Sequence, residues 1–239
     1  MTPDLANDEV QTWRVPLDVP PETSARLYET LSGDERRRSA RFRFEGDRRR
    51  FIVAHGALRE ILGRYLGARP NQLRFVNNAF GKPALSPEFG KRLEFNLSHS
   101  ADLALVAVAA DAKVGVDVEC VRPQPDCAQI ARHFFAPAEV HQLEKLPVHL
   151  QVHAFFDCWT KKEAYVKACG EGLGMPLTSF SVPLTTDHGA SAITVAPRRW
   201  SLYTLRPGPG YIGALAIAGS GWRLSQWNWQ SRDLEAAAG

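Results

Sequence analysis

The sequence has few cysteines, no basic leader and no long apolar run. Its four cysteines, at positions 120, 127, 158 and 169, show no C-x-x-C spacing, so we expect free thiols in a reducing compartment. The first ten residues, MTPDLANDEV, contain neither a basic region nor an apolar stretch, which predicts no signal peptide and a cytoplasmic location. The longest apolar runs, such as LALVAVAA at 103–110, are too short to span a bilayer, so we expect no membrane partner.

What remains is the composition of a folded protein. The chain has 239 residues, of which 44% are hydrophobic and 23% are charged, and its formal net charge is +3. This profile is typical of a globular protein rather than a disordered one. The length suits one large domain or two small ones, each with enough apolar residues for a core.

Helical and strand patterns alternate in an order that occurs twice: a long helix, a Gly/Pro loop, then strands. We therefore predict an α+β fold of two similar subdomains, 1–112 and 113–239, related by a pseudo-twofold axis, with the site in the cleft between them. The predicted helices cover about 21–31, 47–66, 126–145 and 149–169, and the predicted strands cover about 73–76, 93–98, 103–109, 114–119, 178–183, 200–205, 211–217 and 222–229. The strands at 103–109 and 114–119 are expected to form a hairpin.

The segment GVDVE at 115–119 places two carboxylates in a strand that is otherwise apolar. Because side chains alternate between the two faces of a strand, Asp117 and Glu119 share one face. Two like charges at this spacing repel, and one pKa rises unless a cation lies between them. The pair therefore predicts a cationic partner.

A third carboxylate, Glu163, lies in the helical segment at 159–173. One interpretation is a surface ion pair with Lys167, four residues further on, which contributes only about 0.3 kcal/mol. A helical wheel instead turns Glu163 toward the apolar side of the helix and places Asp157 and Lys161 on the solvent side. A buried carboxylate must be paired, protonated or metal-bound. Three inward carboxylates predict a Mg²⁺ site, and this ion favours a substrate phosphate as its next ligand.

Five motifs stand in one order over about residues 30–182. They are FGKP (80–83), FNLSHS (95–100), GVDVE (115–119), RHFFAPAE (132–139) and W-x-x-K-E-A-Y-x-K (159–167). In these motifs the sequence resembles the 4′-phosphopantetheinyl transferases of the surfactin-synthetase-activating (Sfp) type. Members of that family transfer the phosphopantetheine arm of coenzyme A to a serine of an apo carrier protein and release 3′,5′-ADP. The resemblance implies this activity here, with acyl or peptidyl carrier proteins as partners of a monomer.

The resemblance also implies roles for the acidic residues and two lysines. Asp117, Glu119 and Glu163 would hold Mg²⁺ on the coenzyme A pyrophosphate, where the metal neutralises charge as the serine oxygen attacks phosphorus. Glu163 is then the candidate base for the serine proton, directly or through a metal-bound water. Lys167 would stabilise the departing phosphate or supply its proton, and Lys162 is a further candidate phosphate contact.

A second set of residues is implied to bind the nucleotide part of coenzyme A. His99 matches a histidine that contacts the 3′-phosphate in the family, with Ser98 beside it; the alternative for His99 alone is a packed or capping residue. Lys82, in the FGKP turn, is assigned to the nucleotide as well. Arg38 and Arg50 align with basic residues that reach the phosphates.

These two arginines belong to a run of eight between residues 36 and 50. Such a run ordinarily forms a solvated basic face, but guanidinium groups also bind phosphate bidentately. The remaining arginines are candidates for attracting an acidic carrier protein. Glu35 departs from the family pattern, in which a lysine is frequent; this leaves one expected phosphate contact open, and a neighbouring arginine could supply it.

The segment 121–136 has two interpretations. In the family this region helps to dock the carrier protein. Ile130, Phe134 and Phe135 fit either that role or the core.

Other classes of function fit the sequence less well. A nucleic-acid-binding protein would need aromatic stacking platforms beside the arginines, and the acidic residues would repel the phosphates. A serine hydrolase using Ser98, His99 and Asp117 is disfavoured because adjacent strand residues point to opposite faces and no G-x-S-x-G is present. A magnesium-dependent phosphohydrolase is the alternative that needs the same metal site.

Overall fold

The computed structural model describes residues 5–90, 93–122, 126–184, 190–195 and 198–230. Its helices are α1 (Pro21–Tyr28), α2 (Gly33–Ser39), α3 (Glu45–Leu66), α4 (Cys127–Phe134), α5 (Pro137–Lys145) and α6 (Val148–Cys169). Its strands are β1 (Glu9–Pro16), β2 (Phe75–Asn77), β3 (Pro83–Leu85), β4 (Leu93–Ser100), β5 (Leu103–Ala110), β6 (Val114–Cys120), β7 (Ala190–Val195), β8 (Arg198–Leu205), β9 (Tyr211–Ala218) and β10 (Arg223–Asn228).

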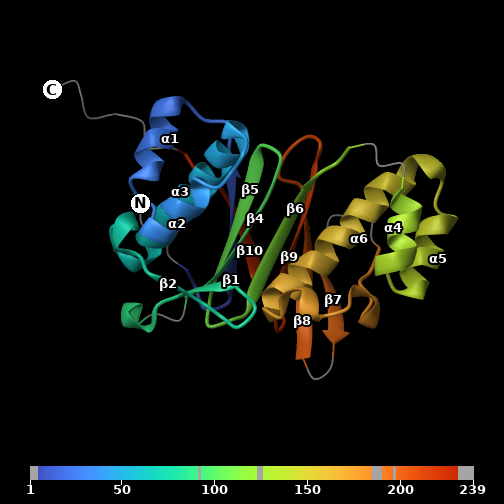
Figure 1. Cartoon of the computed structure of the whole chain (residues 1–239). Coiled ribbons are helices and arrows are strands. Elements are labelled where there is room, and N and C mark those ends of the chain that lie inside the picture. The colour runs from blue at the N-terminus through green and yellow to red at the C-terminus, as the bar shows by residue number, and fades with distance from the viewer. Residues whose placement is uncertain (1–4, 91–92, 123–125, 185–189, 196–197, 231–239) are drawn as a thin grey trace.

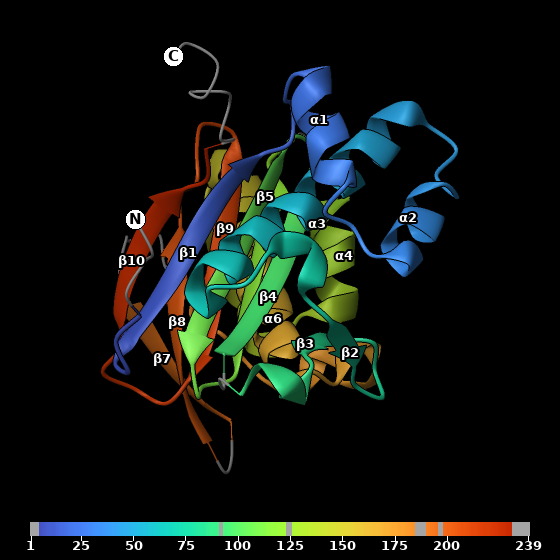
Figure 2. The same cartoon turned by 90° about the vertical axis from the view of Figure 1, so that its left-hand side faces the viewer.

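Two four-stranded sheets lie in the middle of the molecule, with α1–α3 on one outer side and α4–α6 on the other (Figure 1). The strand orders are β10-β1-β5-β4 in the first sheet and β6-β9-β8-β7 in the second, and the first can be followed across Figure 2. Each sheet is accompanied by one helix of 22 residues, α3 or α6. This arrangement confirms the predicted α+β fold of two similar subdomains.

Three apolar cores hold these layers together: one between α3 and the first sheet, one between α6 and the second, and one between the two sheets. The alternation of side chains along β6 divides its residues between two of these environments. Val114, Val116 and Val118 lie in the core between the sheets. Gly115, Asp117 and Glu119 therefore face away from that core, toward α6.

The glycine of the GVDVE segment decides how closely α6 approaches β6. A Cβ atom added at Gly115 would lie 2.1 Å from the carbonyl oxygen of Ala164 and 2.4 Å from the amide nitrogen of Ala168. Only glycine avoids this clash with helix backbone. The close approach brings Lys167 of α6 within reach of Asp117 on β6.

Two predicted helix ends are confirmed. α3 ends before Gly67 and α6 before Gly170, and these glycines have φ values of 62° and 76°. In contrast, the single helix predicted for 126–145 is wrong, because the chain forms α4 and α5 there. The residue before a proline is disfavoured in helical geometry, and Ala136, which precedes Pro137, is extended with ψ 149°.

The predicted hairpin of 103–109 with 114–119 is also wrong. β5 pairs with β1 and β4, whereas β6 pairs with β9 in the other sheet. The apolar residues that suggested pairing, such as Leu105 and Val116, instead meet face to face in the core between the sheets.

The predicted strand at 178–183 is absent from this part of the described chain. Its backbone groups are bound by side chains instead: Val182 N donates to Glu139, and Phe180 O accepts from Lys162. The sequence patterns also missed β1, β7 and α2. β10 pairs with β1, so residues 223–228 of the predicted second subdomain join the first sheet. Among the described residues, no helix is both long and apolar enough to cross a membrane.

Candidate active site

The two subdomains meet where β4 and β6, the edge strands of the two sheets, lie side by side. The polar side chains of β4 bridge the two strands. Asn96 Oδ1 accepts a hydrogen bond from Val116 N at 2.9 Å. Ser98 Oγ donates to Asp117 Oδ1 at 2.8 Å, and Ser100 Oγ donates to Glu119 Oε2 at 2.7 Å. The first half of the chain thus contacts both carboxylates of the GVDVE segment.

Helix α6 adds a cation to this junction. Lys167 Nζ lies 2.6 Å from Asp117 Oδ1 and 2.9 Å from Ser98 Oγ. The lysine side chain is 30% exposed, whereas that of Asp117 is only 5% exposed. The second carboxylate oxygen, Asp117 Oδ2, is buried and has no hydrogen-bond partner among the described residues. An unpaired buried carboxylate oxygen is costly, so it is a candidate position for a ligand.

The pKa values of the three predicted carboxylates are all raised. Burial raises the pKa of Asp117, although Lys167 and Ser98 oppose the shift. Burial also raises the pKa of Glu119, which the hydrogen bond from Ser100 lowers and the charge of Asp117 raises. For Glu163, burial and the charges of Asp117 and Glu119 raise the pKa, and Lys167 opposes them. A divalent cation would relieve this mutual repulsion.

The ligand atoms available at this junction fit a divalent cation, because it has three carboxylates and one of their oxygens, Asp117 Oδ2, has no hydrogen-bond partner among the described residues. The side chains are not closed around a common point, however. Within the described part of the chain, no three His, Cys, Asp or Glu side chains are arranged to hold a metal ion. The ammonium group of Lys167 is the cation that lies on Asp117 here.

His99 lies on the other face of β4, as the alternation of strand residues predicts for a neighbour of Ser98. Partial desolvation lowers the pKa of His99, and the nearby groups His55, Lys167, Arg38 and Arg50 lower it further. These groups therefore form a cationic group around the end of β4. It borders the acidic group, which consists of Asp117, Glu119 and Glu163. Lys167 links the two groups, because its charge shifts the pKa of His99 and the pKa values of all three carboxylates.

The two predicted arginines of the cationic group are held differently. The Arg38 guanidinium lies over the Phe51 ring, 5.3 Å from its centroid, and the side chain is exposed. Arg50 binds two aspartates, with Nε 2.9 Å from Asp102 Oδ1 and Nη1 3.1 Å from Asp47 Oδ1. The hydrogen bond to Asp102 is the main cause that raises the pKa of Arg50.

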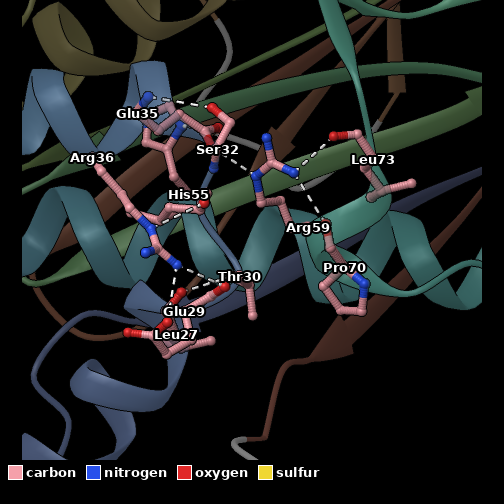
Figure 3. Close-up of polar contacts among 11 residues, drawn as sticks. Leu27, Glu29, Thr30, Ser32, Glu35, Arg36, His55, Arg59, Pro70 and Leu73 are labelled. Carbon is pink, nitrogen blue, oxygen red and sulfur yellow. Dashed lines mark hydrogen bonds and ion pairs between the residues drawn. The ribbon is translucent and has the colours of Figure 1, made fainter.

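Figure 3 shows the contacts of Glu35, the residue at which a lysine was expected from the resemblance. Its carboxylate accepts from Ser32 N at 2.8 Å and thereby caps α2, and its Oε2 accepts from Arg59 Nε at 2.7 Å. Oε1 lies 3.5 Å from His55 Nδ1. Burial alone would raise the pKa of Glu35, but His55, Arg59 and the Ser32 amide lower it to about 2. Glu35 therefore orders the loop and helix that carry Arg38.

Two predicted coenzyme A contacts lie outside both groups. Lys162 is fully buried, and its Nζ lies 2.8 Å from Glu139 Oε2 and donates to Leu177 O and Phe180 O at 2.8 and 2.7 Å. This placement contradicts a phosphate contact, because the ammonium group is inaccessible. Lys82 Nζ donates to Val114 O at 2.9 Å, and burial lowers the pKa of Lys82. In this structure Lys82 links the FGKP turn to β6.

The prediction that Asp157 and Lys161 face solvent is wrong. Asp157 is 2% exposed and Lys161 is 0% exposed, and Lys161 Nζ lies 2.6 Å from Asp157 Oδ2. The helical wheel misplaced them because α6 is covered on more than one side: β6 and β9 of the second sheet, and also α4, α5 and the segment after α6, pack on it.

Three residues at the junction escaped the sequence analysis: Asn96, Ser100 and His55. The first two show a signal in retrospect, since Asn96, Ser98 and Ser100 recur with a period of two and so share one strand face. His55 is four residues from both Phe51 and Arg59, and its ring stacks on Phe51 with centroids 4.0 Å apart.

Comparison with known proteins identifies the family of the chain. Residues 20–112 match the family model described as 4′-phosphopantetheinyl transferase, N-terminal, and residues 113–218 match that of the 4′-phosphopantetheinyl transferase superfamily. The chain is 43% identical to the 4′-phosphopantetheinyl transferase HetI of Nostoc sp. over 226 residues, which is 94% of each chain.

More distant relatives carry the same description. A 4′-phosphopantetheinyl transferase of Bacillus pumilus is 36% identical over 163 residues, 67% of each chain. The 4′-phosphopantetheinyl transferase Sfp of Bacillus subtilis is 29% identical over 199 residues, 82% of this chain and 86% of the relative. With both family models matched and near full-length identity to one relative, the chain belongs to the 4′-phosphopantetheinyl transferase superfamily, whose enzymes transfer the phosphopantetheine arm of coenzyme A to carrier proteins.

Proposed function

We propose that this chain is an Sfp-type transferase that works as a monomer with Mg²⁺ and modifies a serine of an apo acyl or peptidyl carrier protein. The observation that carries the proposal is the junction of an acidic and a cationic group on the two faces of β4. Both groups come from one chain, which supports the monomer. The four cysteines are unpaired thiols, which supports a cytoplasmic location.

The cationic group is the proposed site for the phosphates of coenzyme A. His99, Arg38 and Arg50 lie on β4, α2 and α3. Both arginines are near enough to lower the pKa of His99. A bound anion would offset the positive charges that lower the pKa of His99, and a phosphate offers oxygens for charge-assisted hydrogen bonds. Arg50 would exchange one of its aspartate partners for the ligand.

The acidic group is the proposed metal site. Asp117, Glu119 and Glu163 would hold Mg²⁺, with Asp117 Oδ2 as the oxygen that has no partner of its own. The bound ion would neutralise the charge of the coenzyme A pyrophosphate.

Glu163 and Lys167 are the proposed catalytic residues. Burial and Asp117 raise the pKa of Glu163, which makes its carboxylate a better acceptor for the proton of the attacking serine. Lys167 Nζ is partly exposed and borders the cationic group, which supports a role in stabilising the phosphate that leaves with the nucleotide.

Exposed aromatic residues support a carrier-protein surface at the arginine run and, separately, at α4. Phe42 and Phe44 are 38% and 63% exposed. On α4, Phe134 is 40% exposed, whereas Phe135 is buried in the core. Arginines around Phe42 and Phe44 would attract an acidic carrier, and the rings would pack against its apolar residues.

The test is the intact mass of an apo acyl carrier protein after incubation with this protein, coenzyme A and Mg²⁺. Parallel reactions contain Glu163→Ala or EDTA. We expect a gain of one phosphopantetheine in the complete reaction and none in either control. Release of phosphopantetheine without transfer to any carrier would instead indicate a magnesium-dependent phosphohydrolase. Failure to bind coenzyme A would overturn the proposal.

A further inference from the structure

Ser100 lies at the acidic group but belongs to none of the roles above. It ends β4 in the first subdomain, and its hydroxyl reaches across to β6 in the second. Ser100 Oγ lies 2.7 Å from Glu119 Oε2 and 3.1 Å from Cys120 N. No other β4 side chain among the described residues binds Glu119.

The direction of these two hydrogen bonds is decided by chemistry. An amide N–H only donates, so Ser100 Oγ must accept from Cys120 N. A hydroxyl has a single proton, which is therefore left for the carboxylate. Ser100 consequently donates to Glu119 Oε2, and this bond favours the ionised carboxylate in one orientation.

Ser98, two residues before Ser100 on β4, forms the same kind of arrangement. The Lys167 ammonium group only donates, so Ser98 Oγ accepts from it and donates its own proton to Asp117 Oδ1. Each serine binds one oxygen of one carboxylate. At Asp117 the other oxygen is the buried Oδ2 that lacks a partner.

We propose that Ser100 is a positioning residue that orients Glu119 as a ligand for the divalent cation, so that a residue of the first subdomain fixes the orientation of a carboxylate of the second. The inference rests on the proposed metal site. Partners that orient metal ligands typically change metal affinity about 10-fold to 100-fold when removed. Among the described residues the Ser100 hydroxyl forms hydrogen bonds only with Glu119 and with a backbone amide, which makes it a cleaner probe than Ser98, whose hydroxyl also binds Lys167.

The experiment compares Ser100→Ala with Ser100→Thr, which keeps a hydroxyl. Ser225→Ala is the matched control, because Ser225 on β10 donates to Glu9 in the same kind of serine–glutamate bond, far along the chain from the site. The probe is Mn²⁺, whose free concentration is measured by electron paramagnetic resonance in the presence of coenzyme A, with coenzyme A alone as the blank. The Mg²⁺ concentration that gives half-maximal transfer is measured in parallel.

For Ser100→Ala we expect about a 10-fold rise in the Mn²⁺ dissociation constant and in the half-saturating Mg²⁺ concentration. Ser100→Thr should restore most of the affinity, and Ser225→Ala should bind Mn²⁺ like the wild type. Unchanged Mn²⁺ affinity in Ser100→Ala would overturn this inference and leave the metal site intact. If the wild-type protein itself binds no Mn²⁺ with coenzyme A, the proposed metal site fails, and the inference fails with it.

Discussion

Two lysine–carboxylate pairs on the same helix differ in what surrounds them. In the first, Lys162 of α6 binds Glu139 of α5, and both are fully or almost fully buried. Glu139 Oε1 also accepts from Val182 N, and Oε2 from Ala136 N, both at 2.7 Å. In the second, Lys167 binds Asp117, whose Oδ2 has no hydrogen-bond partner among the described residues.

The Lys162–Glu139 pair is a structural ion pair, whereas the Lys167–Asp117 pair lies at the proposed ligand site. A buried pair with every oxygen bonded repays its desolvation and holds neighbouring segments in place. The segment after α6 is held in this way, through the carbonyls that Lys162 binds. A pair with an unbonded buried oxygen and a partly exposed lysine retains binding capacity. Residue types alone do not distinguish the two pairs; the saturation of their hydrogen bonds does.

Breaking the Lys162–Glu139 pair, in which both carboxylate oxygens are hydrogen-bonded, should have the largest effect on stability. Lys162→Met leaves the Glu139 carboxylate buried without its cation, which costs about 3–5 kcal/mol in the free energy of unfolding. Urea denaturation measures this loss. Replacing both partners, Lys162→Met with Glu139→Gln, should recover part of it. A loss below about 1 kcal/mol for the single variant would contradict a structural role for the pair.

Glu35 is a second carboxylate with partners for both oxygens, and it makes the stability of the fold depend on pH. Its pKa in the folded protein is lowered from 4.5 to about 2, so its ionised form stabilises the fold by about 3 kcal/mol at neutral pH. Because the folded-state pKa is depressed, this contribution is complete above pH 4.5 and is lost as the pH falls toward 2. Glu35→Gln should therefore be less stable at pH 7, and the difference should shrink below pH 4.5. A difference that does not change with pH would contradict it.

Breaking the unsaturated pair should affect transfer more than stability. Lys167→Met removes a cation beside the proposed phosphate site, and we expect transfer to fall about 100-fold, equivalent to about 2.7 kcal/mol of activation free energy. Stability should fall less than for Lys162→Met, because burial already raises the pKa of Asp117 and a proton can replace the lysine. Steady-state kinetics and urea denaturation on the same samples decide between these effects.

The contact that brings the second pair together can be tested through Gly115. Gly115→Ala places a methyl group against the backbone of α6, so helix and strand must separate, at a cost of about 1–3 kcal/mol. Transfer should fall by more than the stability loss explains, because Lys167 moves away from Asp117. Gly208→Ala is the control: its added Cβ would meet only the Arg14 side chain, at 3.6 Å. Wild-type activity in Gly115→Ala would contradict the role given to this contact.

Local patterns in the sequence were enough to predict much of the fold and part of the site. Helix ends at Gly67 and Gly170 were predictable because left-handed backbone favours glycine. Long-range pairing was not: the edge strand β10 joins β1 from the other end of the chain, and no local pattern reports this. Lys162 and Lys167 look alike in sequence, yet only one of them is buried completely.

The sequence by itself determined which carboxylates share a face, because the period of a strand places Asp117 with Glu119, and it determined where the two long helices end. The tertiary structure alone decided which charged groups are saturated. Glu139 has its partners from α6 and from a segment some 40 residues away, whereas Asp117 Oδ2 has none among the described residues. The physical reason is that hydrogen-bond saturation depends on packing between distant elements, while periodicity depends only on the local backbone.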